Sequence, residues 1–144
     1  MATSTIARRR SRRTLAVDTI EAAAYAAGAL LLAAEGAVHA EQFVSGFNSV
    51  AWIGPLFLAN AAACVVAIAG MGFARTRRIA ALGGVVISTV ALLSLVVSYG
   101  MGLFGWQEGS FRPEVAIAAF TEAGAVIALS TALALSNASA YRAS

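Results

Sequence analysis

The chain alternates between long apolar stretches and short polar breaks. Two stretches, residues 42–74 and 79–107, contain no Asp, Glu, Lys or Arg. A helix needs about 20 predominantly apolar residues to cross a bilayer. The apolar segments before and after these stretches provide two further candidate membrane spans. The pattern predicts an all-α fold, a polytopic membrane bundle whose four transmembrane helices lie at residues 15–41, 50–73, 79–101 and 113–136.

Residues at the predicted helix ends agree with these boundaries. A polar turn containing Gly46 and Asn48 precedes the second helix. Pro113 suits the first turn of a helix, where its missing N–H costs nothing, and the carboxylate of Glu114 complements the positive end of the helix dipole. The rest of the chain forms an arginine-rich tail at 1–14 and a short tail at 137–144, which leaves no room for a soluble domain.

The composition agrees with a membrane protein. Only 12% of the residues are charged and 60% are hydrophobic, whereas an ordinary globular domain carries about 25% charged residues. So few charges cannot cover the surface of a water-soluble protein. All ten basic residues are arginine and none is lysine, which argues against the Arg/Lys-studded surface of a nucleic-acid-binding protein. The expected surroundings are a lipid bilayer, with no nucleic-acid partner.

The arginines also predict the orientation. All of them except Arg112, with clusters at residues 8–13 and 75–78, fall on one side of the predicted spans. Cytoplasmic loops carry the excess of positive charge, so both termini are expected in the cytoplasm. Trp52 and Trp106 fall on the opposite side, as an aromatic belt at the outer interface would.

The N-terminal segment admits a second interpretation. Residues 11–15 resemble a twin-arginine export signal, and residues 38–40 fit a small-x-small cleavage site. Cleavage there would leave three spans. However, the apolar stretch is longer than the about 7–15 residues of a signal's hydrophobic region, and Asp18, Glu21 and Glu35 interrupt it. The uncleaved, four-span form is therefore favoured.

Ionisable side chains within the spans each require a partner or a function, because their insertion costs roughly 2.5–3.5 kcal/mol at mid-helix. In the first helix, Glu21, Glu35, His39 and Gln42 share one helical face. Glu35 and His39 are one turn apart, so their side chains can meet. We expect this face to point at the other three helices.

Polar residues of all four helices fall at one depth in the outer half of the membrane. At about 1.5 Å per residue, Glu35 lies roughly 9 Å below the outer boundary, Glu122 roughly 12 Å and Asn60 roughly 13 Å. Tyr99 lies near the outer end of the third helix. With His39, these residues form a candidate ligand- or ion-binding cluster and a candidate proton relay. The alternative is structural, since the same groups can satisfy one another as interhelical hydrogen bonds.

The inner half is expected to hold no comparable cluster, because only Ser and Thr occur there after Arg78. In the third helix, a face of small residues with Gly84 and Ser88 allows close helix packing. This face is expected to lie in the bundle interior, which is the favoured interpretation. The alternative is an interface with a second copy of the chain or with a partner protein. The glycine-rich, apolar loop at residues 100–113 is predicted to fold over the bundle mouth, as a lid or as an interfacial anchor.

The sequence offers little sign of a metal, a cofactor or an enzyme. Glu35, His39 and Glu122 are weak candidates for metal ligands, because a single His with Glu four residues before it falls short of the two-His spacing of zinc enzymes. His39 is the only histidine, which excludes a haem held by two histidines within one chain. Cys64 is alone and is expected to be a small buried residue. No nucleophile with a neighbouring base is evident, so no enzymatic activity is predicted.

Three short motifs follow one another along the chain: Glu35 with His39, the turn Ser-Tyr-Gly-Met-Gly-Leu-Phe-Gly at 98–105, and Glu114 with Glu122. In this order they resemble the uncharacterised small four-span membrane proteins of high-GC Gram-positive bacteria. Phe104 stands where a proline is frequent in that family. The resemblance implies the four-span fold and a place in the bacterial plasma membrane, and it brings no established activity.

Two functions remain open. The favoured one is a structural or accessory four-helix bundle that assembles with itself or with a partner complex. The alternative is a small proton- or cation-coupled transporter in which Glu35 and Glu122 bind the coupling ion or a cationic substrate. Small multidrug transporters share the four spans and a membrane-embedded Glu, but this analogy concerns architecture alone.

Overall fold

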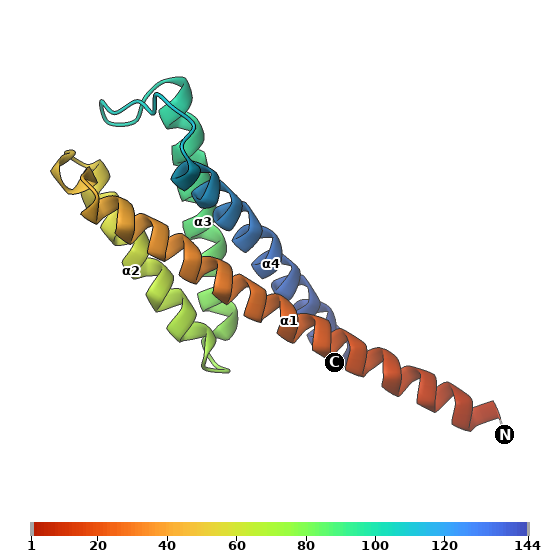
Figure 1. Ribbon diagram of the computed structural model, residues 1–144. Coiled ribbons are helices and arrows are strands. Elements are labelled where there is room, and N and C mark those ends of the chain that lie inside the picture. Colours follow the sequence, from red (N-terminus) through yellow and green to blue (C-terminus); the bar gives the residue numbers. More distant parts are fainter. Residues whose placement is uncertain (1, 144) are drawn as a thin grey trace.

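The computed structural model describes the backbone of residues 2–143 and the side chains of residues 15–141. Its elements, in chain order, are α1 (Ala2–Val44), the short 3-10 helix η1 (Phe47–Ser49), α2 (Ile53–Met71), α3 (Arg77–Gly100) and α4 (Pro113–Ala143) (Figure 1). The predicted all-α, four-helix architecture is therefore confirmed.

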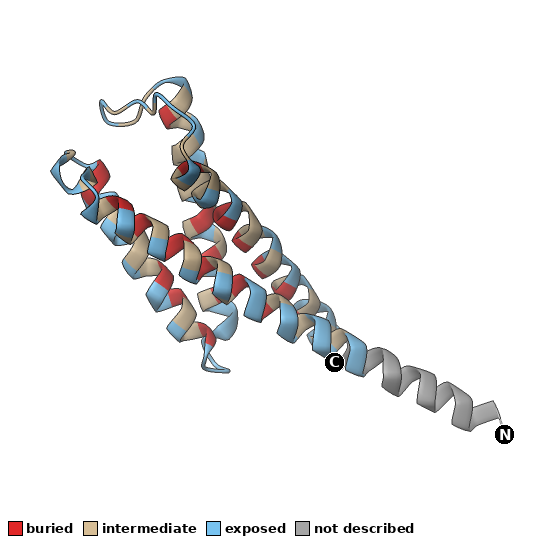
Figure 2. Cartoon of the chain, viewed as in Figure 1, coloured by how far each residue is buried: buried red, intermediate tan, exposed pale blue. Residues whose placement is uncertain are grey.

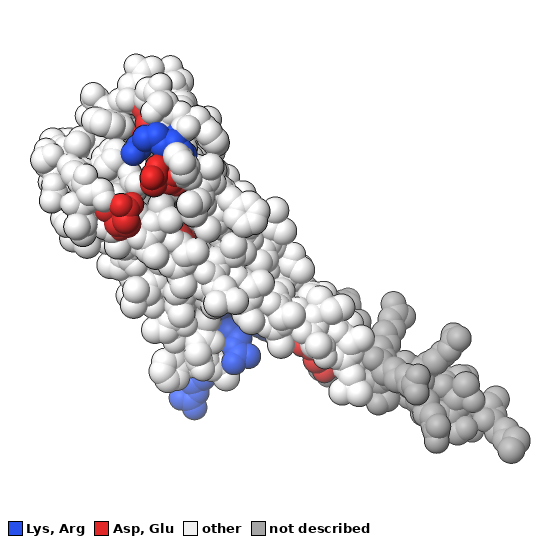
Figure 3. Space-filling model, in the orientation of Figure 1, with Lys and Arg blue, Asp and Glu red and all other residues white. Residues whose placement is uncertain are grey.

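All four long helices are long and apolar enough to cross a membrane, over Leu15–Val44, Ile53–Met71, Arg77–Gly100 and Pro113–Tyr141. Large apolar side chains point outward from the bundle. Leu30, Val65 and Phe120 are each about two-thirds exposed or more, and pale, exposed positions follow the outer side of every helix (Figure 2). Figure 3 shows the charged side chains of one face near its two ends, with an uncharged belt between them. Such a surface suits a hydrocarbon surrounding.

The helices at the two ends of the chain are longer than the predicted spans. The backbone of α1 is already helical at Ala2, and α4 continues to Ala143. No glycine or proline occurs before Gly28 or after Gly124, so no residue in either terminal segment breaks the helix. The arginine side chains at 8–13, predicted to set the topology, lie outside the side chains that the structure describes.

The four helices form a ring in which each packs against its neighbours in the chain and α4 packs back against α1. Across the ring, α1 touches α3, whereas α2 and α4 make no contact over the described residues. The connections at residues 45–52 and 101–112 lie at one end of the bundle, and we call this the aromatic end. The connection at 72–76 and the C-terminus lie toward the other, the arginine end (Figure 1).

Midway along the bundle, two leucines fill notches left by glycines. Leu32 of α1 and Leu129 of α4 are fully buried. Leu129 packs against Gly28 and Gly84, and Leu32 also packs against Gly84. The small-residue face of α3 thus lies in the bundle interior, as favoured above. Large side chains set into glycine notches leave no gap between the helices.

This packing predicts opposite effects of alanine at two adjacent glycines of α3. A Cβ at position 84 would lie 2.7 Å from Leu129 Cδ1 and 2.9 Å from Leu32 Cδ1, whereas a Cβ at Gly83 meets nothing within 4 Å. Gly84→Ala should cost about 1–3 kcal/mol through overpacking. Gly83→Ala should be neutral or should stabilise the helix by up to about 1 kcal/mol. Unfolding of the two variants by sodium dodecyl sulfate, followed by circular dichroism, compares them; equal stability would show that the notch is not tightly filled.

A second polar cluster lies at the arginine end, where the sequence led us to expect none. Ser136 Oγ donates to Glu21 Oε1 at 2.6 Å and lies 3.0 Å from the Tyr25 hydroxyl. Arg78 donates to the Ser136 carbonyl at 3.0 Å, and the Arg77 guanidinium lies 5.7 Å from the centre of the Tyr25 ring. The expectation failed because Ser136 is the last residue of the predicted span and because its partners lie on two other helices. This cluster ties α1, α3 and α4 together.

Candidate functional site

Glu35 is the centre of the polar cluster in the aromatic half of the bundle. Its side chain is fully buried. Asn60 of α2 donates to Oε1 at 3.1 Å, and Ser88 of α3 donates to Oε2 at 2.6 Å. The second distance is typical of a hydroxyl that donates to a carboxylate. Both oxygens of Glu35 are therefore engaged, and the side chain links α1 to two other helices.

The neighbours of Asn60 orient its amide group. Cys64, one turn along α2, lies with Sγ 3.5 Å from Asn60 Oδ1, in position to donate a weak hydrogen bond. The amide oxygen thus faces the thiol and the amide nitrogen faces Glu35. Cys64 is 1% exposed, which agrees with its expected place as a small buried residue. The sequence singled out Asn60 by depth alone, and the structure brings it to Glu35.

His39 contacts both of its buried neighbours through different ring nitrogens. Its Nδ1 lies 2.9 Å from the backbone carbonyl oxygen of Glu35, and its Nε2 lies 3.7 Å from Glu122 Oε1. A carbonyl oxygen can only accept, so Nδ1 carries a hydrogen. The ring also packs edge-on against Phe57, with 5.2 Å between the ring centres. These contacts hold the imidazole with Nε2 facing Glu122.

Glu122 of α4 is the least satisfied polar side chain of the cluster. It is 1% exposed, and its Oε1 faces His39. Its Oε2 is the one buried side-chain oxygen or nitrogen among the described residues that has no hydrogen-bond partner. A buried polar atom without a partner costs free energy comparable to a lost hydrogen bond. Such an atom in a folded protein calls for a specific reason, such as a bound ion, a water molecule or a role in chemistry.

The facing atoms of His39 and Glu122 require a proton between them. With Nδ1 protonated, Nε2 of a neutral ring is an acceptor, and both oxygens of an ionised Glu122 are acceptors as well. Two acceptors that face each other in a buried site repel. One proton therefore resides on this pair, either on Nε2 of the imidazole or on the carboxyl group of Glu122.

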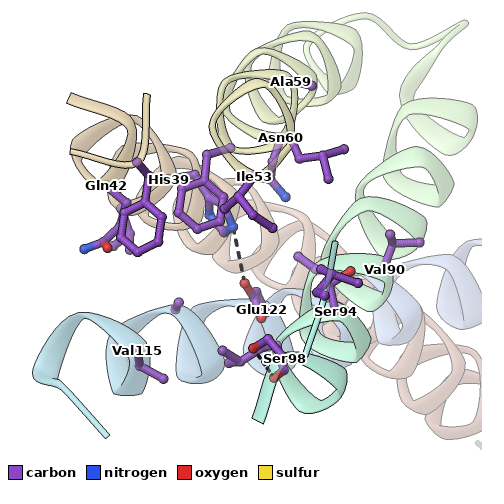
Figure 4. Close-up of a pocket in the computed structure, with 18 of the residues that line it drawn as sticks. His39, Gln42, Ile53, Ala59, Asn60, Val90, Ser94, Ser98, Val115 and Glu122 are labelled. Atoms are coloured by element: carbon purple, nitrogen blue, oxygen red, sulfur yellow. Dashed lines mark hydrogen bonds and ion pairs between the residues drawn. The ribbon is translucent and has the colours of Figure 1, made fainter. Parts of the chain in front are cut away.

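A cavity of about 390 Å³ opens beside this pair, and all four helices line it, including α2 and α4, which do not pack against each other. Figure 4 shows His39 and Glu122 facing each other at its wall, with Asn60 contributed by α2 and Ser98 by α3. Most of the other lining side chains are aliphatic or aromatic, with Val38, Ile53, Leu56, Phe57, Val90 and Leu95 among them. A mostly apolar pocket with a few convergent polar groups is the usual form of a small-molecule site.

The two connections at the aromatic end meet over this cavity. Leu103 and Trp106 of the second connection line it, and Trp106 packs against Phe47 of the first with 5.1 Å between the ring centres. Phe47 also packs against Phe57 of α2, at 5.0 Å. The loop at 100–113 therefore lies over the mouth of the cavity, as predicted. Its role as a lid or as an interfacial anchor stays a prediction.

Tyr99 does not join the cluster. Its hydroxyl donates to the Ser110 carbonyl at 2.9 Å and so fastens the end of α3 to the loop. Its neighbour Ser98 lines the cavity instead, because consecutive helix residues point about 100° apart. Depth alone could not separate the two positions.

Sequence reasoning also missed the role of Ser88. It was assigned to a packing face, whereas its hydroxyl is a direct partner of Glu35. Depth did not signal it, because at about 1.5 Å per residue Ser88 lies roughly 20 Å below the outer end of the predicted third span, well below the predicted depth of Glu35. Serine is also too common in membrane helices to stand out.

Among the described residues, no group of three or more His, Cys, Asp or Glu side chains is placed to hold a metal ion. Glu35, His39 and Glu122 therefore do not form a metal-ligand set. Comparisons with protein families, with curated proteins and with solved structures find no match to this chain. The site must be interpreted from its own geometry.

Proposed function

We propose that this chain is a small proton-coupled carrier of the bacterial plasma membrane that binds its substrate in the cavity between α2 and α4. The observation that carries the proposal is the unpartnered Oε2 of Glu122, buried at the wall of a mostly apolar cavity. A purely structural carboxylate would be fully hydrogen-bonded, as Glu35 is. A carboxylate with one free oxygen and a shared proton suits exchange of that proton for a ligand.

The orientation belongs to the same proposal. The arginines at 75–78 lie at the arginine end together with the C-terminus, and cytoplasmic loops favour arginine. We place this end in the cytoplasm, with both chain termini. The aromatic end, with Trp52 and Trp106, then lies at the outer interface, and the cavity is entered from outside.

Glu35 and Glu122 have different roles in this scheme. Glu35 holds α1, α2 and α3 together at the level of the site. Glu122 and His39 hold the exchangeable proton. Toward the cytoplasm, the buried pair of Leu32 and Leu129 closes the bundle. In this outward-facing arrangement, the leucine pair is the inner barrier, and this barrier must open to release the substrate into the cytoplasm.

The first test removes the titratable group of Glu122. In proteoliposomes with a trapped pH-sensitive dye, Glu122→Gln should reduce substrate-driven proton movement at least 10-fold, because glutamine cannot give up a proton. Glu41→Gln is the matched control, since Glu41 is exposed at the end of α1 and bonds only to its neighbours Gln42 and Ser45; it should retain wild-type flux. Unchanged flux in Glu122→Gln, with circular dichroism like that of the wild type, would contradict the proposal.

A second candidate function is an accessory bundle without transport. The network of Glu35, Asn60 and Ser88 favours it, because interhelical hydrogen bonds alone are a sufficient reason for polar residues in a membrane bundle. In that case Glu122→Gln would leave flux at the background of empty vesicles, as in the wild type. Chemical cross-linking in native membranes would instead capture a second copy or a partner protein.

A further inference from the structure

The charged side chains that line the cavity carry an acidic excess. Those described are Glu108, Arg112, Glu114 and Glu122, with His39 as a further titratable group. Arg112 pairs with Glu108 at 3.2 Å, and these two charges cancel. Glu114 near the mouth remains as a negative charge, and Glu122 at the inner wall adds a second one when the proton that it shares with His39 leaves. A cavity of this kind attracts positive charge and repels anions.

Aromatic rings surround the entrance to the same cavity. Phe47, Phe57 and Trp106 line it and pack against one another in sequence. The guanidinium of Arg112 already lies 5.7 Å from the centre of the Phe47 ring. Cations are attracted to the faces of aromatic rings at such distances. The chain's own arginine thus shows that this aromatic cluster accommodates a positive group.

We infer that the substrate is a monovalent organic cation with an apolar body, such as an arylalkylammonium ion. Its positive group lies at Oε2 of Glu122, and its apolar body lies against the aliphatic and aromatic walls. The volume of about 390 Å³ admits one small molecule, in the range of about 300–1,000 Å³ typical of ligand pockets. This inference rests on the proposed function and names the substrate class of the same site.

Charge balance at the inner wall links this cation to the proton. Before binding, His39 and Glu122 hold one proton between them, and their total charge is zero. A monovalent cation that binds to ionised Glu122 leaves the total at zero only if that proton departs to the solvent. Retaining both would place an imidazolium and the cation against the single carboxylate of Glu122, while the carboxylate of Glu35 is already held by Asn60 and Ser88. Two positive groups on one carboxylate are strongly unfavourable in a buried site. Each bound cation should therefore release one proton.

Fluorescence can report binding, because the chain has two tryptophans and only Trp106 lines the cavity. Trp52 is 69% exposed, so Trp52→Phe leaves one reporter at the site. The purified protein in nanodiscs is titrated with benzyltrimethylammonium, whose charge is permanent. Neutral benzyl alcohol and anionic phenylacetate are the matched comparisons. We expect a saturable change in Trp106 fluorescence with the cation and at least 10-fold weaker binding of the other two.

The same titration in weakly buffered solution with a pH indicator measures proton release. We expect one proton per bound cation, and both binding and release should be lost in Glu122→Gln. Glu114→Gln, at the mouth, should weaken binding by only about 2–3-fold, since its charge is half-exposed and screened. Equilibrium dialysis of labelled cation with the wild-type protein covers the case in which Trp52→Phe does not fold.

Two outcomes separate the inference from the proposed function. If phenylacetate or benzyl alcohol binds as tightly as the cation, the substrate class is wrong, while proton movement that depends on Glu122 can still support a carrier. If the cation binds without proton release and Glu122→Gln binds it equally well, Glu122 is not its site and the inference is overturned. Failure of all three compounds to bind overturns it as well.

Discussion

Replacing Glu35 with alanine is expected to destabilise the bundle by about 2–4 kcal/mol. The side chain is fully buried and accepts hydrogen bonds from two other helices. An interhelical hydrogen bond in a membrane contributes about 0.6 kcal/mol on average and up to about 1.7 kcal/mol. The truncation removes two such bonds, leaves Asn60 and Ser88 without their partner, and opens a void among three helices.

Glutamine at the same position should restore most of the lost stability. Its amide oxygen can accept from Asn60, and its amide nitrogen can donate to the hydroxyl oxygen of Ser88. We expect Glu35→Gln to lie within about 1 kcal/mol of the wild type, because volume and both bonds are retained. The measurement is unfolding in mixed micelles of increasing dodecyl sulfate content, monitored by circular dichroism.

A double-mutant cycle with Asn60→Ala isolates the bond between the two residues. A coupling of about 0.5–1.5 kcal/mol is expected. Thr131→Ala serves as the control, since its exposed hydroxyl bonds only to the Ile127 carbonyl of its own helix. If Glu35→Ala unfolds at the same dodecyl sulfate fraction as the wild type, Glu35 does not hold the helices together.

The four helices could be predicted because the bilayer leaves few choices. Backbone groups in hydrocarbon must bond within their own segment, so a long apolar run is helical. The fixed rise per residue then placed Glu35, Asn60 and Glu122 at one depth, and the spacing of four residues placed His39 on the face of Glu35. The structure brings Asn60 to Glu35 and His39 to Glu122.

Features that depend on how the helices are rotated and separated could not be predicted in the same way. Ser98 and Tyr99 were indistinguishable by depth, and only the rotation of α3 decides which residue lines the cavity. The contact of Ser136 with Glu21 joins residues 115 positions apart in the chain, and nothing local signals it. The cavity arises because α2 and α4 do not touch, a property of the whole ring.

Replacing Leu129 with alanine is expected to cost about 2–5 kcal/mol and to make the protein leak protons. Leu129 is fully buried and fills the notches at Gly28 and Gly84, so its truncation leaves a void that the rigid helix backbones cannot close. On α4 it lies seven residues from both Glu122 and Ser136, roughly 10 Å from each. Leu129 and Leu32 thus separate the cavity from the polar cluster at the arginine end.

Removal of this barrier should raise the proton permeability of proteoliposomes several-fold in the absence of any substrate. Ile127→Ala is the matched control, because Ile127 lies on the same helix but is 68% exposed on the outer surface of the bundle; it should change stability by less than about 0.5 kcal/mol and leave permeability unchanged. Leu129→Met conserves volume, should cost less than about 1.5 kcal/mol and should retain the barrier. If Leu129→Ala remains folded and its vesicles hold a proton gradient as long as the wild type does, the inner barrier lies elsewhere in the bundle.

A leak in Leu129→Ala that Glu122→Gln suppresses in the double variant would instead place both residues on one proton path, since the gap at Leu129 would then conduct only protons that the carboxyl group delivers.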